Sequence, residues 1–141
     1  MTIGDTLLSL LRFFFPEAAP AGPVHETPAF RIMRQFNHNG LIGAEGRFVH
    51  MIEDHRDPDG RLYRLEYVST RDGRHAIAYC RYKPWPNGSP HLLTGGLICI
   101  GPGGHNSDTA SSSYGLQYVI PRARYWCTAT SVYQETGEFP D

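Results

Sequence analysis

Cys99 is the residue of this sequence best suited to chemistry. It stands in the short apolar run 97–100, between the glycine pair 95–96 and the glycine-rich stretch 101–104. Glycine allows tight backbone turns and leaves room for a bulky substrate to approach the sulfur. A thiol in this setting favours nucleophilic catalysis, with an acyl group held as a thioester. The alternative is that Cys99 is a small buried hydrophobic residue, as reduced cysteine often is.

Two histidines flank Cys99 in the sequence and complete the predicted catalytic set. An ordinary thiol, with a pKa of about 8.5, is mostly protonated at pH 7, so it needs an assisting group or an activated acyl donor. His91 and His105 are the candidate assistants. The other two cysteines, Cys80 and Cys127, lie among aromatic and small residues, and we expect both in the core.

No cofactor or metal is expected from the motifs. The spacing of His91, Cys99, His105 and Cys127 matches no zinc pattern, and no CxxC pair is present. The stretch 101–104 lacks the Lys-Ser/Thr that follows the glycines of a phosphate loop.

Composition narrows the class of protein and its compartment. The chain has 141 residues, which favours one domain over 1–141, and a net charge of −1. Its 13 basic residues are twelve arginines and Lys83, scattered rather than clustered, so we expect no nucleic-acid partner. Three cysteines cannot all pair as disulfides, which favours the reducing cytoplasm. The start lacks a signal-peptide pattern, and its apolar stretch is too short to span a bilayer.

The N-terminal third predicts two helices. Apolar residues at helical spacing, with Asp5 as a cap and Pro16 as a stop, predict an amphipathic helix over 5–15. Its apolar face packs either on the domain's own core or on a partner or membrane surface. Residues 17–28 are expected to form a linker, and a second short helix is expected over 29–37.

The middle of the chain predicts an antiparallel meander. Strands are expected over 47–53, 62–69 and 75–82, because turn-rich sequences separate them. On the second strand the buried face is expected to be the aromatic one, with Tyr63, Leu65 and Tyr67.

The remainder is expected to be irregular and then helical. The proline-rich segment 83–90 is expected on the surface, and the charged cluster 54–57 is expected to be solvated. From residue 111 the pattern predicts two helical segments divided at Pro121, with strand alternation over 125–132 as the alternative. The tail 135–141 is expected to be frayed. The predicted class is α+β, with the meander packed on helices.

This order of features resembles the ubiquitin-conjugating E2 (UBC-like) fold. Gly96-Leu97-Ile98-Cys99-Ile100 resembles the E2 motif GxICL, and His91 stands near the place of the histidine in the HPN tripeptide, eight residues before the cysteine rather than ten. Size and the region 79–140, including the run from Arg122 to Cys127, resemble the compact bacterial E2-like proteins of short type II CBASS antiviral operons. The first 40 residues add little to the resemblance.

The resemblance implies a reaction and a partner. Cys99 would form a thioester with the C-terminal carboxyl of a cGAS-like nucleotidyltransferase, and the acyl group would pass to an amine on a target protein or small molecule, in anti-phage defence. Because Lys83 is the single lysine of the sequence, an enzyme that carries an activated acyl group would have few amines of its own to modify. The acyl donor must be activated elsewhere, and Asp108 is a candidate to orient the amine.

The sequence departs from the family at the oxyanion position. Leu92 and Leu93 follow His91, so the HPN asparagine is missing. His91 itself, Asn106, or backbone amides near Gly95 and Gly103 are the candidate donors. The runner-up function is a non-catalytic E2-like binding module that uses the N-terminal helix or Trp85 as an anchor, and a cysteine hydrolase is a third possibility.

Overall fold

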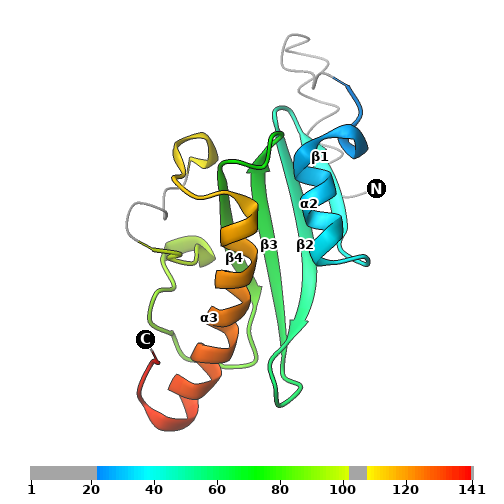
Figure 1. Ribbon diagram of the computed structural model, residues 1–141. Helices are drawn as coiled ribbons and strands as arrows, with labels where there is room; N and C mark the ends of the chain where they lie inside the picture. The colour runs from blue at the N-terminus through cyan, green and yellow to red at the C-terminus, as the bar shows by residue number, and fades with distance from the viewer. Residues whose placement is uncertain (1–21, 102–107, 141) are drawn as a thin grey trace.

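The computed structural model describes residues 22–101 and 108–140 (Figure 1). The predicted helix over 5–15 and residues 17–21 of the predicted linker lie outside the described residues. In chain order, the described elements are η2 (Val24–Glu26), α2 (Pro28–Phe36), β1 (Leu41–Glu45), β2 (Phe48–Arg56), β3 (Leu62–Thr70), β4 (Ala76–Tyr82), η3 (Thr94–Gly96), η4 (Thr109–Ser111) and α3 (Leu116–Thr136).

Four antiparallel strands form one sheet in the order β1-β2-β3-β4. The three strands expected from the sequence are confirmed as β2, β3 and β4, and the meander is confirmed. The first strand, β1, was not predicted, because Gly43 and Ala44 give it little β propensity. The strands pack closely there, since a Cβ on Gly43 would lie 2.8 Å from Nε2 of His50 on the neighbouring strand and the imidazole would have to move.

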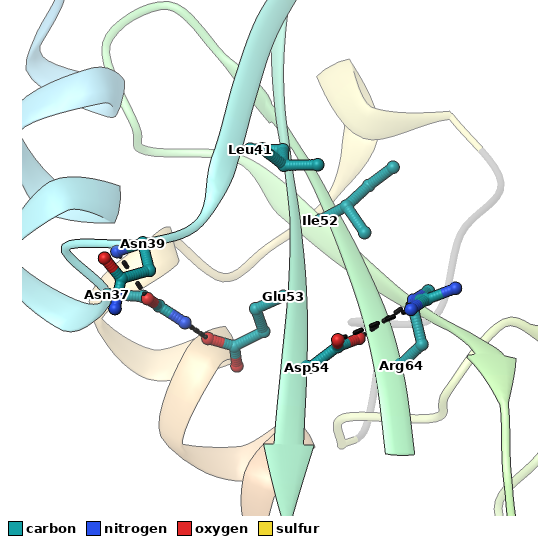
Figure 2. Close-up of a pocket in the computed structure, with 7 residues that line it drawn as sticks. All are labelled: Asn37, Asn39, Leu41, Ile52, Glu53, Asp54 and Arg64. Carbon is teal, nitrogen blue, oxygen red and sulfur yellow. Dashed lines mark hydrogen bonds and ion pairs between the residues drawn. The ribbon is translucent and has the colours of Figure 1, made fainter. Parts of the chain in front are cut away.

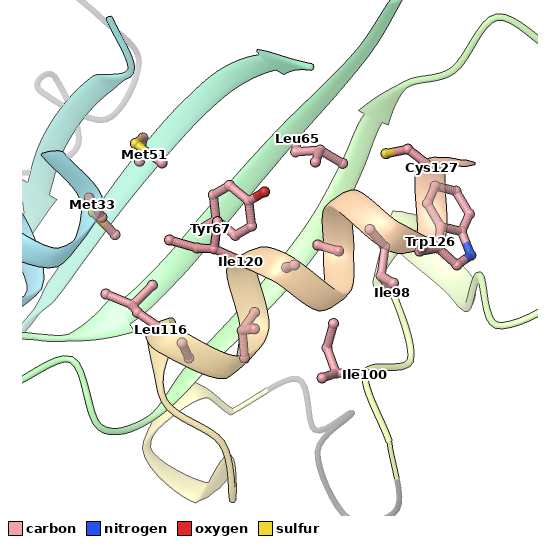
Figure 3. Packing of buried hydrophobic residues seen from close by; sticks show 14 of the residues in the cluster. Met33, Met51, Leu65, Tyr67, Ile98, Ile100, Leu116, Ile120, Trp126 and Cys127 are labelled. Atoms are coloured by element: carbon pink, nitrogen blue, oxygen red, sulfur yellow. The ribbon is translucent and has the colours of Figure 1, made fainter. Parts of the chain in front are cut away.

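Helices α2 and α3 pack on one face of the sheet, and the core lies between them and the strands (Figures 1 and 3). The predicted aromatic face of β3 is confirmed, because its inward side chains have no exposed surface: Tyr63, Leu65 and Tyr67. The segment after β4 adds Ile98 and Ile100 to the same core.

Helix α2 confirms the helix expected over 29–37. The Thr27 hydroxyl caps its start by accepting a hydrogen bond of 3.1 Å from the Phe30 amide, and Pro28 occupies the first helical position, where no amide donor is needed. Within the expected linker, Val24–Glu26 forms a 3-10 turn.

Helix α3 corrects the expectation of two segments divided at Pro121. It is one helix of 21 residues, and the strand alternative over 125–132 is wrong. Pro121 lies on the exposed face, where water can satisfy the Gln117 carbonyl that lacks its helical donor. Gly137 ends the helix in the left-handed conformation, with its amide donating to the Tyr133 carbonyl at 2.7 Å. None of the helices in the described ranges has the length and apolar character needed to cross a bilayer.

Candidate active site

The segment that carries Cys99 is hydrogen-bonded to the edge of β4. Leu97 pairs with Tyr79 of β4 as an antiparallel bridge, and the Ile98 amide donates to the Ala78 carbonyl at 2.9 Å. Residues next to Cys99 in the chain, Ile98 and Ile100, are buried in the core, whereas Cys99 itself is half-buried. The backbone around the sulfur is therefore fixed by the sheet and the core, while the thiol keeps some contact with solvent.

His91 lies directly opposite Cys99 in a tight hairpin. Leu92 pairs with Ile98 as an antiparallel bridge, and the Cys99 amide donates to the His91 carbonyl at 2.7 Å. The structure therefore brings these two predicted residues together at the level of the backbone. His91 has a positive φ of 64°, and its imidazole lies against the Phe139 ring with 5.0 Å between ring centres.

Two glycines form the turn of this hairpin. Gly95 and Gly96 have φ values of 78° and 85°, in the left-handed region that favours glycine. A Cβ on Gly96 would lie 2.6 Å from the carbonyl oxygen of Cys80 on β4, whereas a Cβ on Gly95 would have no atom within 4 Å. Gly96 is thus required both by its conformation and by the close approach of the turn to the sheet.

A matched pair of substitutions tests this difference. Gly95→Ala is expected to lower the free energy of unfolding by about 1 kcal/mol, the cost of a left-handed alanine. Gly96→Ala is expected to cost about 2–3 kcal/mol, because the β4 backbone must also shift. Urea denaturation of both variants measures the two costs, and equal values would show that the turn is not pressed against Cys80.

The remaining predicted groups have different outcomes. His105, Asn106 and Gly103 lie outside the described residues, so their candidate roles stay predictions. Asp108 is exposed and caps η4, where its carboxylate accepts from the Ala110 amide at 2.9 Å and from the Ser111 hydroxyl at 3.1 Å. Among the residues that the structure describes, no group of three His, Cys, Asp or Glu side chains is placed to hold a metal ion.

The other two thiols are held in their protonated form. Cys127 is fully buried on α3, as expected, and burial raises its pKa strongly. Cys80 is half-buried and packs against the core, and burial raises its pKa to about 11, although Lys83 opposes the shift. The three cysteines form no disulfide.

The proline-rich segment is fastened to the core by Trp85. Its indole nitrogen donates to the Tyr63 hydroxyl at 2.9 Å, and the Arg61 guanidinium lies 4.9 Å from the ring centre. The ammonium of Lys83 donates to the carbonyls of Trp85, at 2.6 Å, and Asn87, at 2.5 Å. Trp85 is therefore half-buried and anchors this segment to the core, and its expected role as an anchor for a partner stays a prediction.

The C-terminal tail corrects the expectation of a frayed end. Phe139 is half-buried and packs against the core, and the Tyr125 hydroxyl donates to the Pro140 carbonyl at 3.3 Å. The apolar pair Phe139-Pro140 was the sequence signal for this docking, but it stands within an acidic and polar stretch. The tail now forms one wall beside His91.

The expectation of a solvated cluster over 54–57 is wrong for Asp57. Its side chain is buried and accepts a hydrogen bond from the Ser131 hydroxyl at 2.6 Å, and Tyr63 shares that hydroxyl at 2.6 Å. Burial alone would raise the pKa of Asp57, but the hydrogen bonds from Ser131 and Arg61 lower it overall. Asp57 thus joins the β2–β3 turn to α3.

A second buried carboxylate, Glu53, was also missed. Its oxygens accept from Tyr67 at 2.7 Å, from Asn37 at 2.8 Å and from Arg124 at 2.9 and 2.8 Å. Burial alone would raise the pKa of Glu53, but these hydrogen bonds lower it overall. No sequence pattern links Glu53 to Arg124, because they are 71 positions apart.

Glu53 also lines a hollow of about 710 Å³ beside β1 and β2 (Figure 2). The hollow is open, and its other acidic group, Asp54, is paired with Arg64 at 2.9 Å. Both carboxylates are therefore already neutralised by arginines, and the hollow offers no unpaired acid for catalysis. Cys99 remains the better candidate for chemistry.

No protein-family model matches the chain, and neither the curated proteins nor the solved structures contain a significant match. A proposal about function therefore rests on the residues and geometry around Cys99.

Proposed function

We propose that this chain is an E2-like conjugating enzyme that carries an acyl group on Cys99 as a thioester and transfers it to an amine. The observation that carries the proposal is the placement of Cys99, half-buried, on a segment held by the β4 edge and directly opposite His91. A helix, a four-stranded meander, an irregular segment, a cysteine and a further helix follow one another along the chain. This order supports the UBC-like fold that the GxICL resemblance implies.

The proposed reaction has two steps. The Cys99 sulfur attacks the carbonyl carbon of an activated acyl donor, a thioester or acyl phosphate made by a separate activating enzyme. A carbon–sulfur bond forms, the donor's leaving group departs, and the thiol proton passes to it or to water. An amine nitrogen then attacks the thioester carbonyl, an amide forms, and the Cys99 thiolate leaves and takes up a proton.

The partner assignment follows the same resemblance. The acyl donor is the C terminus of a cGAS-like nucleotidyltransferase, and His91 and His105 are the candidate assisting groups. The protein acts in the cytoplasm and is encoded in an antiviral operon. Because the imidazole of His91 lies against Phe139, movement of the tail would change what His91 can reach. Co-purification with a nucleotidyltransferase encoded in the same operon would support this partner.

The test of the chemistry uses a small thioester as donor. Wild-type protein is expected to gain one acyl group by intact-mass spectrometry, and the group is expected to leave on treatment with a thiol reductant. Cys99→Ser is expected either to hold the group as a thiol-resistant oxyester or to take up none, whereas Cys80→Ser, the matched control, is expected to behave as wild type. Uptake by folded Cys99→Ala at the wild-type rate would overturn the proposal.

A further inference from the structure

Three exposed residues form a continuous stripe along α3. Tyr118, Arg122 and Tyr125 are four and three positions apart, so they share one face of the helix. The tyrosines are 43% and 40% exposed, and the Arg122 guanidinium lies 5.9 Å and 5.7 Å from their ring centres. The stripe therefore presents a cation between two aromatic rings.

The stripe joins the Cys99 segment at one end. Tyr114 stacks on Tyr118 with 4.5 Å between ring centres. The Tyr114 hydroxyl lies against Gly101, only 3.3 Å from the position that a Cβ would take there. Gly101 stands two residues after Cys99, so this end of the stripe abuts the nucleophile's own segment.

The other end of the stripe joins the wall beside His91. Tyr125 holds the tail through Pro140, and the neighbouring Phe139 ring lies against the imidazole of His91. Figure 1 shows the segment after β4 and the C-terminal end on the same side of α3. The stripe thus runs along the helix between the two segments that frame the site.

Arg122 differs from the arginines that support the fold. Within the described residues its side chain makes no ion pair or hydrogen bond, whereas four other arginines are paired with carboxylates: Arg61, Arg64, Arg81 and Arg124. A guanidinium is suited to binding a carboxylate through two parallel hydrogen bonds, and flanking tyrosines supply flat apolar surface for a peptide. The chemistry complementary to the stripe is an acidic peptide.

We propose that the stripe of Tyr118, Arg122 and Tyr125 is the docking surface for the terminal segment of the protein acyl donor, and that this segment carries an acidic side chain that pairs with Arg122. The inference rests on the proposed function, since it assigns the binding of that reaction's donor. Docking there brings the donor's C-terminal carbonyl toward Cys99 along a surface continuous with the site.

The experiment uses two synthetic peptides that end in the same thioester. One has a glutamate and the other a lysine at each of the positions three to five residues before the thioester, and a small thioester without a peptide serves as the third donor. Transfer to Cys99 exchanges one carbon–sulfur bond for another and releases the donor's thiol. Intact-mass spectrometry follows the rate for wild type, Arg122→Gln, Arg122→Glu and the matched control Arg31→Glu, which makes the same charge change on the exposed face of α2.

Wild type and Arg31→Glu are expected to react up to about fivefold faster with the acidic peptide, the size of an exposed ion pair. Arg122→Gln is expected to lose this preference and Arg122→Glu to reverse it, with the small thioester reacting equally in all four proteins. An unchanged preference in both Arg122 variants would overturn the docking surface and leave the proposed function standing. Failure of every donor, including the small one, to acylate folded wild type would overturn both.

Discussion

Arg124→Ala is expected to lower the free energy of unfolding by about 3–5 kcal/mol, the usual cost of removing one partner of a buried ion pair. The Glu53 side chain is 1% exposed, and Arg124 supplies two of its four hydrogen bonds. Arg124 also donates to the Phe36 carbonyl at 3.0 Å. Its loss leaves a buried carboxylate with only Asn37 and Tyr67 as donors and separates α3 from the end of α2.

Urea denaturation at neutral pH measures this cost, and Arg122→Ala is the matched control. Arg122 stands two positions earlier on the same helix but is exposed, so its removal is expected to change stability by no more than about 0.5 kcal/mol. Equal, small losses in both variants would contradict the structural role of the Glu53 cluster.

The same cluster predicts a pH dependence. Because the pKa of Glu53 is lower in the folded protein than its ordinary value of 4.5, ionised Glu53 contributes stability above that value. This contribution is lost as the pH falls through the lower, folded-state pKa. Wild type is therefore expected to lose more stability on acidification than Arg124→Ala, because that variant lacks the side chain that contributes most to lowering the pKa of Glu53.

Iodoacetamide at pH 8 is expected to alkylate Cys99 at least about 100-fold faster than Cys80 or Cys127 in the native protein. Only the thiolate reacts, and with a pKa of about 11 roughly one Cys80 thiol in a thousand is ionised at that pH. Cys127 has no exposed surface and a more strongly raised pKa. Cys99 is the remaining thiol, half-buried on the turn segment.

Peptide mapping of the native protein over time gives the three rates, and the same reaction in urea is the control, since unfolding should make the rates similar. Alkylation of Cys80 before Cys99 would contradict the assignment of Cys99 as the accessible nucleophile. Slow alkylation of all three would favour the binding-module reading.

The strands could be predicted because their signals are local. Alternating residues and the turns around Gly60 and Gly73 fixed three strands and the buried face of β3. The sequence could not reveal β1, whose stability comes from pairing with β2 rather than from its own residues. The predicted break at Pro121 was wrong for the opposite reason. Proline is a strong local signal for the end of a helix, but the packing of α3 on the sheet overrides it.

In the candidate site, too, local contacts could be predicted from the sequence and long-range contacts could not. Cys99 and His91 stand on the two arms of one short hairpin, so their nearness in sequence carried through to the structure. The Glu53–Arg124 pair and the docking of Phe139 beside His91 join segments that are far apart in the chain. Such contacts exist only after the sheet and α3 have assembled.

The pairing of Leu97 and Ile98 with β4 has a further consequence for solubility. The meander leaves the outer edge of β4 with backbone groups that could pair with a strand of another molecule, and the Cys99 segment covers them together with Ser112 and Tyr114. The segment that carries Cys99 therefore also protects the β4 edge from edge-to-edge aggregation. Variants in which this segment is loosened are expected in the insoluble fraction. Any activity that such a variant loses would therefore reflect aggregation through the exposed β4 edge as well as damage to the candidate site.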